Sequence, residues 1–75
     1  MSTEPNLSNT NLSGSTFAAS NLTNVNFSHS NISGCELKNA LNLDKEQLNE
    51  AWAWEGEEPT LPFDYEIKTV AAKST

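Results

Sequence analysis

Large apolar residues recur at every fifth position through the first half of this chain, and this spacing restricts the fold strongly. On an α-helix, five steps of about 100° turn each such residue roughly 140° away from the last, so no apolar stripe forms. On a straight strand, an odd period sends successive residues to opposite faces. The repeat therefore excludes both ordinary elements. The seven positions are Leu7, Leu12, Phe17, Leu22, Phe27, Ile32 and Leu37.

The spacing becomes consistent with a single core if the backbone turns a corner once in every repeat. A mostly small residue stands two positions before each large one, and strand geometry places the two on one face. The other residues are mostly asparagine, serine, threonine and glycine, which tolerate turn dihedrals and bond to their own backbone. We therefore expect every large residue to point inward, with Cys35 as a buried small residue beside them.

A square coil of four repeats would stack residues that lie twenty positions apart, and the sequence supports this register. Like residues coincide at that separation often enough to favour a four-sided coil. Examples are Gly14 over Gly34, Asn6 over Asn26, Asn11 over Asn31, Leu12 over Ile32 and Thr10 over Ser30.

The chain resembles the pentapeptide-repeat family, with the consensus A-(N/D)-L-x-x, over the run NLSNT-NLSGS-TFAAS-NLTNV-NFSHS-NISGC-ELKNA. The resemblance covers about residues 5–41 and departs from the pattern at Pro5, which occupies the first small site. It implies an all-β solenoid, namely a right-handed quadrilateral β-helix. Seven repeats make about two coils, and we place this domain at residues 5–42.

A stub of two coils exposes an unpaired edge at each end, so it needs a cap, a partner chain or both. Residues 43–55 carry the signals of a short capping α-helix, with Asp44 at the N-cap and Gln47 at N3. Leu48 and Trp52 share one apolar face, four residues apart. A helix of this length is unstable alone in water. We expect it to dock on the open end of the solenoid.

After the predicted helix, alternating apolar and polar residues indicate a loop and an extended arm over residues 56–68. We expect residues 69–75 to form a flexible tail and residues 1–4 a disordered N-terminus. In bacterial members of the family that the chain resembles, a helix and tail close the C-terminal end, and in several they form a dimer interface. The resemblance therefore implies a homodimer here.

Charge is concentrated in the second half of the chain. Residues 6–41 hold one acid and one lysine, whereas residues 42–75 hold eight acids and three lysines; the whole chain has a net charge of −6 and no arginine. This argues against direct nucleic-acid binding. No apolar run approaches the roughly 18 residues of a membrane span, and the N-terminus lacks the pattern of a secretory signal. We expect a cytoplasmic protein with no membrane partner.

Catalysis and metal binding are not expected. His29 follows a large residue by two positions, at a corner that should face solvent. A lone histidine, a cysteine at a buried position and scattered carboxylates provide no acid–base pair and no set of metal ligands. We predict that the chain is not an enzyme and uses no cofactor.

The leading interpretation is a non-enzymatic protein–protein interaction module that self-associates through its C-terminal helix and arm. DNA mimicry, the best-known activity of the family, suggests the alternative of a small acidic inhibitor of DNA gyrase, a nuclease or a CRISPR complex. Two layers span only about 10 Å, and the solenoid is neutral, so it is a poor copy of a duplex. An ice-binding surface is a weaker alternative, because its Ser and Thr columns are irregular.

Tryptophan is common at interface hot spots, which makes Trp54 a candidate anchor for a partner. Packing against the arm at Phe63 or Tyr65 is an equally good interpretation of Trp54. Trp52 is expected to face the core as part of the cap. The candidate partner-binding residues are Trp52, Trp54, Glu55, Glu57, Glu58, Phe63 and Tyr65.

Overall fold

The structure, a computed structural model, describes residues 6–71. Its named elements are the 3₁₀-helix η1 (Lys45–Leu48) and the strands β1 (Trp52–Trp54) and β2 (Lys68–Val70). The predictions for residues 1–5 and 72–75, including the disordered N-terminus and the end of the tail, lie outside the described residues. Within residues 6–71, no helix is long and apolar enough to cross a membrane.

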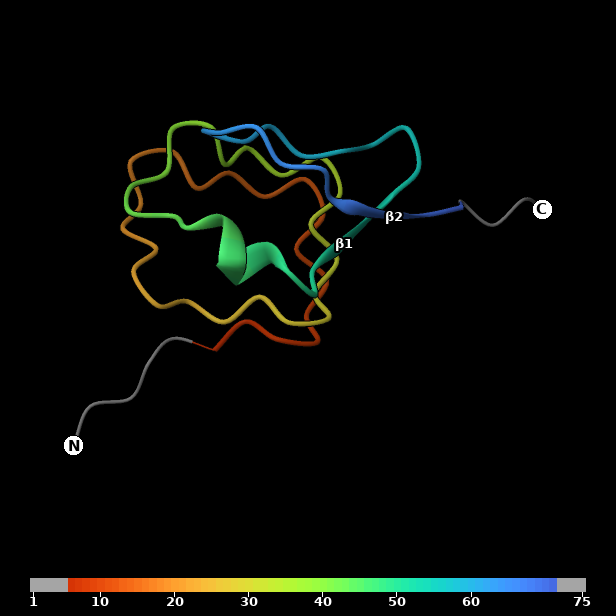
Figure 1. Cartoon of the computed structure of the whole chain (residues 1–75), viewed down its shortest axis with the longest axis horizontal. Helices are drawn as coiled ribbons and strands as arrows, with labels where there is room; N and C mark the ends of the chain where they lie inside the picture. The colour runs from red at the N-terminus through yellow and green to blue at the C-terminus, as the bar shows by residue number, and fades with distance from the viewer. Residues whose placement is uncertain (1–5, 72–75) are drawn as a thin grey trace.

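The repeats trace a square in which residues twenty positions apart pair in parallel (Figure 1). The N–H of Leu12 donates to the carbonyl of Asn31 at 2.8 Å, and the N–H of Asn31 donates to Thr10 at 2.9 Å. Residues 6–25 thus form a first layer, with a second layer stacked on it. We number the four sides after the large residues of the first layer, from side 1 at Leu7 to side 4 at Leu22. The bridges are Asn6–Asn26, Asn11–Asn31, Thr16–Glu36 and Asn21–Leu41.

The corners are tight turns with a left-handed residue at a fixed place. In a typical corner, the N–H of Ser15 donates to the carbonyl of Leu12 at 3.0 Å. A turn in which only the third residue has positive φ is type II, and it favours glycine or asparagine at that position. This explains the residue two positions after six of the seven large ones, Asn39 after Leu37 being the exception. The six residues with positive φ at this position are Asn9, Gly14, Ala19, Asn24, His29 and Gly34.

Asparagine immediately before a large residue stabilises the corner that follows. The N–H of Ser8 donates to Oδ1 of Asn6 at 2.9 Å, which forms an Asx turn. The same bond recurs through the repeats and gives the amide at the start of each turn an acceptor. The other asparagines that accept it are Asn11, Asn21, Asn26 and Asn31.

The core lies along the axis of the square and is better covered in the second layer than in the first. Phe27, Ile32 and Leu37 of the second layer have no exposed surface. In the first layer, Leu22 is also buried, whereas its three preceding equivalents are only half-buried. Those three residues are Leu7, Leu12 and Phe17. The solenoid is therefore thinly covered at its N-terminal end.

The prediction of a capping α-helix over residues 43–55 is wrong, because the helix stops after its first turn. Its beginning has the predicted capping bond, since the N–H of Asp44 donates to Oε1 of Gln47 at 2.7 Å. The amide of Gln47 then donates to the carbonyls of Leu22 and Val25, at 2.8 and 2.9 Å. Figure 1 shows η1 lying across the interior of the square. The cap is thus one turn of 3₁₀-helix held by a side chain.

A third layer replaces the rest of the predicted helix. The N–H of Trp52 donates to Ser30 at 3.0 Å, and the carbonyl of Trp52 accepts from Ile32 at 2.8 Å. Thr60 pairs with Glu36 on side 3 in the same way. An extended chain satisfies the backbone groups at the edge of the second layer, which a helix would leave without protein partners. This gain explains why tertiary pairing overrides the local helical signals.

The arm ends in a strand, so the prediction of a flexible tail from residue 69 is wrong for Thr69 and Val70. Strand β2 pairs in parallel with β1 and forms a fourth layer on side 2. Ile67, immediately before β2, is 6% exposed and belongs to the core cluster. A buried anchor next to paired backbone explains why this segment is ordered.

Candidate functional site

The two tryptophans lie together on the outer face of side 2. Ala51 and Ala53 are fully buried, so the alternation of a strand turns Trp52 and Trp54 outward. The indole rings meet edge to face, with centroids 4.9 Å apart and planes at 84°. The expectation that Trp52 would face the core depended on the predicted helix and is wrong, since Trp52 is half-buried on the outer surface.

Hydrogen bonds to the second layer hold both tryptophans in place. Nε1 of Trp52 donates to the carbonyl of His29 at 3.3 Å. The backbone N–H of Trp54 donates to Oγ of Ser33 at 2.7 Å. His29 is exposed, and its Nε2 lies 3.1 Å from Oε1 of Glu50. The aromatic pair is therefore attached to a stacked backbone rather than to a free loop.

The acidic loop follows β1 directly. Glu57 donates its N–H to the carbonyl of Trp54 at 3.0 Å, and Gly56 between them has a φ of +82°. Glu55, Glu57 and Glu58 are all exposed. The turn thus places three carboxylates on the surface next to the tryptophan pair.

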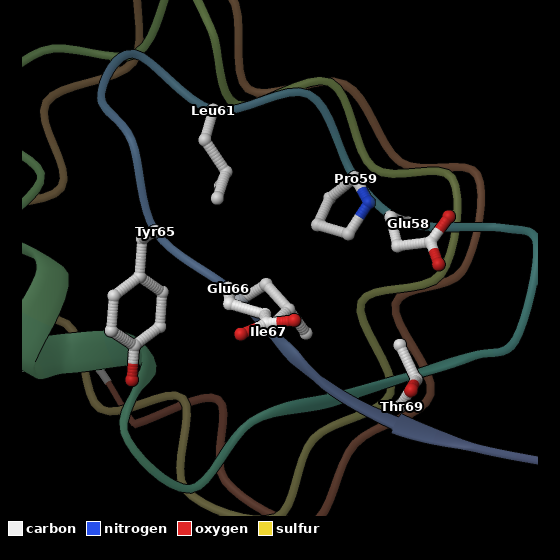
Figure 2. Close-up of a pocket in the computed structure, with 7 residues that line it drawn as sticks. All are labelled: Glu58, Pro59, Leu61, Tyr65, Glu66, Ile67 and Thr69. Atoms are coloured by element: carbon white, nitrogen blue, oxygen red, sulfur yellow. The ribbon is translucent and has the colours of Figure 1, made fainter.

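Phe63 and Tyr65 lie with the cap and not with the tryptophans. Both are half-buried and pack against the core cluster. Tyr65 also lines an open pocket of about 330 Å³ formed by the loop and arm (Figure 2). Figure 2 shows Leu61, Pro59 and Ile67 around the same space. The seven candidate residues therefore occupy two regions, one on the outer face of side 2 with the loop after β1, and one in the arm against the core.

Cys35 belongs to the core. It is 1% exposed, and its Sγ lies 3.0 Å from the carbonyl oxygen of Leu12. Burial raises the pKa of its thiol, and a backbone hydrogen bond with Ser15 opposes this shift less strongly. A thiol that resists ionisation is a poor nucleophile, so Cys35 has a packing role. Among residues 6–71, no three His, Cys, Asp or Glu side chains are grouped as metal ligands would be.

The sequence predicts the stack of Asn11 on Asn31, but the position of the tryptophans beside that stack was not predicted. Nδ2 of Asn31 donates to Oδ1 of Asn11 at 3.3 Å, and Trp52 continues this column in the third layer. The orientation of the tryptophans could have been predicted from the alternation A-W-A-W over residues 51–54. A period of two predicts a strand with both tryptophans on one face.

Comparison with known families supports the resemblance inferred from the residues. A family model described as pentapeptide repeats matches residues 6–41 in eight copies. The family prediction is therefore confirmed, with one copy more than the seven large residues suggest. Pentapeptide repeats imply a right-handed β-helical solenoid, in agreement with the stacked layers. No curated protein and no solved structure matches the chain.

Proposed function

Because this chain is a pentapeptide-repeat protein over residues 6–41, we propose that it is a non-enzymatic protein–protein interaction module that self-associates through its C-terminal segment. Proteins of this family are commonly interaction modules and are generally non-enzymatic. The proposal assigns self-association to the outer edge of β2, at the end of the arm. The partner is a second copy of this chain.

The observation that carries the proposal is the state of β2. All three of its residues are exposed. The carbonyl of Val70 accepts from the N–H of Glu55 at 2.8 Å, so the backbone groups of Val70 face β1. Since successive residues of a parallel strand bond to opposite neighbours, the N–H and C=O of Thr69 face away from β1. Within residues 6–71, no strand pairs with this outer edge.

An exposed strand edge is a template for another strand. Two copies related by a two-fold axis would pair β2 with β2 in antiparallel fashion, centred on Thr69. That register sets Lys68 of one copy opposite Val70 of the other, so no like charges face each other across the pair. The strand offers a lysine and no carboxylate at this contact, although the surrounding segment is acidic.

Sedimentation equilibrium of the full chain and two variants tests this proposal. We expect the wild-type chain to be a dimer, and Thr69→Ala, which keeps the backbone N–H, to remain one. Thr69→Pro removes the outward N–H without removing a bond to β1, so it should be monomeric. A wild-type chain that stays monomeric at high concentration would refute self-association. A dimeric Thr69→Pro variant would refute the assignment to the β2 edge.

A second candidate function follows from the charge of the C-terminal segment. All eight acidic residues between positions 42 and 71 are exposed. Such a surface favours binding to the basic groove of a DNA-processing or defence enzyme such as DNA gyrase, a nuclease or a CRISPR complex. The assay is inhibition of each enzyme at increasing salt, which should weaken the effect. Inhibition that survives combined Glu55→Gln, Glu57→Gln and Glu58→Gln changes would show that these carboxylates are not responsible.

A further inference from the structure

A shallow groove of about 340 Å³ runs over the outer face of side 2 and the corner before it. Its upper wall is the tryptophan pair of the third layer. Its floor comes from the first and second layers, through Asn9, Asn11, His29 and Asn31. Layers are about 4.8 Å apart, so the groove extends roughly 10 Å from Asn11 to Trp52. No residue of β2, to whose outer edge self-association is assigned, lines the groove.

Contacts within the protein position the aromatic wall before any ligand arrives. Trp52 is tied through its ring nitrogen to the backbone of His29, and Trp54 through its backbone to Ser33. The edge-to-face contact further fixes the two rings against each other. Because both rings are half-buried and already ordered, binding would cost little side-chain entropy.

The floor offers neutral hydrogen-bonding groups. The amide of Asn31 bonds within the protein, since its Oδ1 accepts from the N–H and Oγ of Ser33 and its Nδ2 donates one bond to Asn11. Oδ1 of Asn11 accepts from Asn31 and from Ser13. Among the described residues, Nδ2 of Asn11 and the side-chain amide of Asn9 have no protein partner. Both residues are exposed, so these amides are free to bond to a ligand.

The chemistry of the groove restricts its occupant. No lysine or arginine lines it and the chain has a net charge of −6, which disfavours an anion such as a phosphate. No carboxylate lines it either, which disfavours a cation. A purely apolar ligand would leave the asparagine amides desolvated and unbonded. The groove therefore suits a neutral ligand with one flat apolar face and polar edges.

We propose that this groove is a carbohydrate-binding site, in which a pyranose ring stacks on the indole of Trp54 and its hydroxyl groups bond to Asn9 and Asn11. The C–H face of a pyranose is apolar and nearly flat, as the indole surface is. Its equatorial hydroxyls both donate and accept, so they match amide groups that do the same. The two free amides lie in the first layer, which would orient a sugar chain along the stack of layers.

Titration with defined neutral oligosaccharides tests the site. The probes are cellotetraose, chitotetraose, maltotetraose and mannotetraose at millimolar concentrations, each added to the full chain. The readouts are tryptophan fluorescence and the NMR shifts of the two indole N–H groups. We expect at least one probe to saturate both signals. Trp54→Ala should weaken its binding about tenfold or more, as for a central aromatic contact.

Two asparagine variants form a matched pair for the same titration. Asn11 and Asn21 each hold an Asx turn and each accept a bond from an asparagine in the next layer, but only Asn11 lines the groove. Asn11→Ala should weaken saccharide binding several-fold, and Asn21→Ala should leave it unchanged. Equal losses in both variants would refute a direct contact. The absence of saturable binding by all four probes, or a Trp54-dependent peptide ligand in their place, would overturn the proposal.

Discussion

The corner residue two positions after each inward side chain determines how easily the chain turns. Six of these residues have φ between +57° and +76°, a region that costs an L-residue with a Cβ roughly 1–2 kcal/mol. Glycine and asparagine occupy four of the six positions and reduce this cost. Ala19, with a φ of +61°, has neither the freedom of glycine nor the local bonding of asparagine. It is therefore a locally strained position in the first layer.

Replacing Ala19 by glycine should stabilise the protein, against the usual effect of that change. We expect the free energy of unfolding of Ala19→Gly to rise by about 0.5–1 kcal/mol, because relief of the left-handed strain exceeds the added chain entropy. Urea denaturation followed by tryptophan fluorescence measures this. Ala18→Gly, at the neighbouring exposed position without positive φ, is the control and should be destabilising. If both variants changed the free energy of unfolding in the same direction, the assigned turn type would be contradicted.

The buried thiol of Cys35 predicts a specific pH dependence of stability. Its pKa in the folded protein is raised above the usual 9.0, so the unfolded chain releases the proton first as the pH rises. The thiol therefore costs no stability below the unfolded pKa and becomes destabilising as the pH climbs toward the folded pKa. We expect the unfolding free energy of the wild type, relative to Cys35→Ser, to be constant below about pH 8 and to fall above it. If the unfolding free energies of the wild type and Cys35→Ser differed by the same amount at every pH from 7 to 10, the thiol would not be buried.

At the level of elements, the regular part of the fold could be predicted from the sequence and the C-terminal part could not. The repeat specifies its own turns, because each corner uses residues within five positions of one another. Residues 43–55 contain two competing patterns, a capping signal at Asp44 and Gln47 and a period of two from Ala51 to Trp54. The competition is decided by the unpaired edge of the second layer, which is a tertiary feature. Local propensity alone therefore could not place the end of the helix.

Gln47 is the side chain that holds the cap in place. It accepts from the N–H of Asp44 and donates to the carbonyls of Leu22 and Val25. Gln47→Ala leaves these partly buried groups without partners and should lower the unfolding free energy by about 1–3 kcal/mol. Glu46→Ala, at the exposed neighbouring position, is the control and should change it by less than about 0.5 kcal/mol. Chemical denaturation of both variants gives the comparison, and equal effects would contradict the role of Gln47.

At the scale of the whole molecule, the two ends of the solenoid core are covered to different extents. The C-terminal end carries η1, a third layer on two sides and a fourth on one, whereas the N-terminal layer leaves Leu7, Leu12 and Phe17 half-buried. The candidate sites follow from this asymmetry, because the extra layers carry both the tryptophan wall and the free β2 edge. Sequence reasoning identified the tryptophans by residue type. It predicted the stack of Asn11 over Asn31 but not the tryptophans beside that stack, since the third layer depends on pairing with the edge of the second.

The most direct test of the central claim is the pairing between layers, measured as through-hydrogen-bond scalar couplings by NMR on the isotope-labelled chain. The account predicts a coupling from the amide nitrogen of Leu12 to the carbonyl carbon of Asn31, and another from Ile32 to Trp52. The first establishes the twenty-residue square coil and the second establishes the third layer. Couplings between residues four positions apart in residues 7–37, as in an α-helix, would contradict the coil. A helical pattern through residues 45–54 would contradict the third layer.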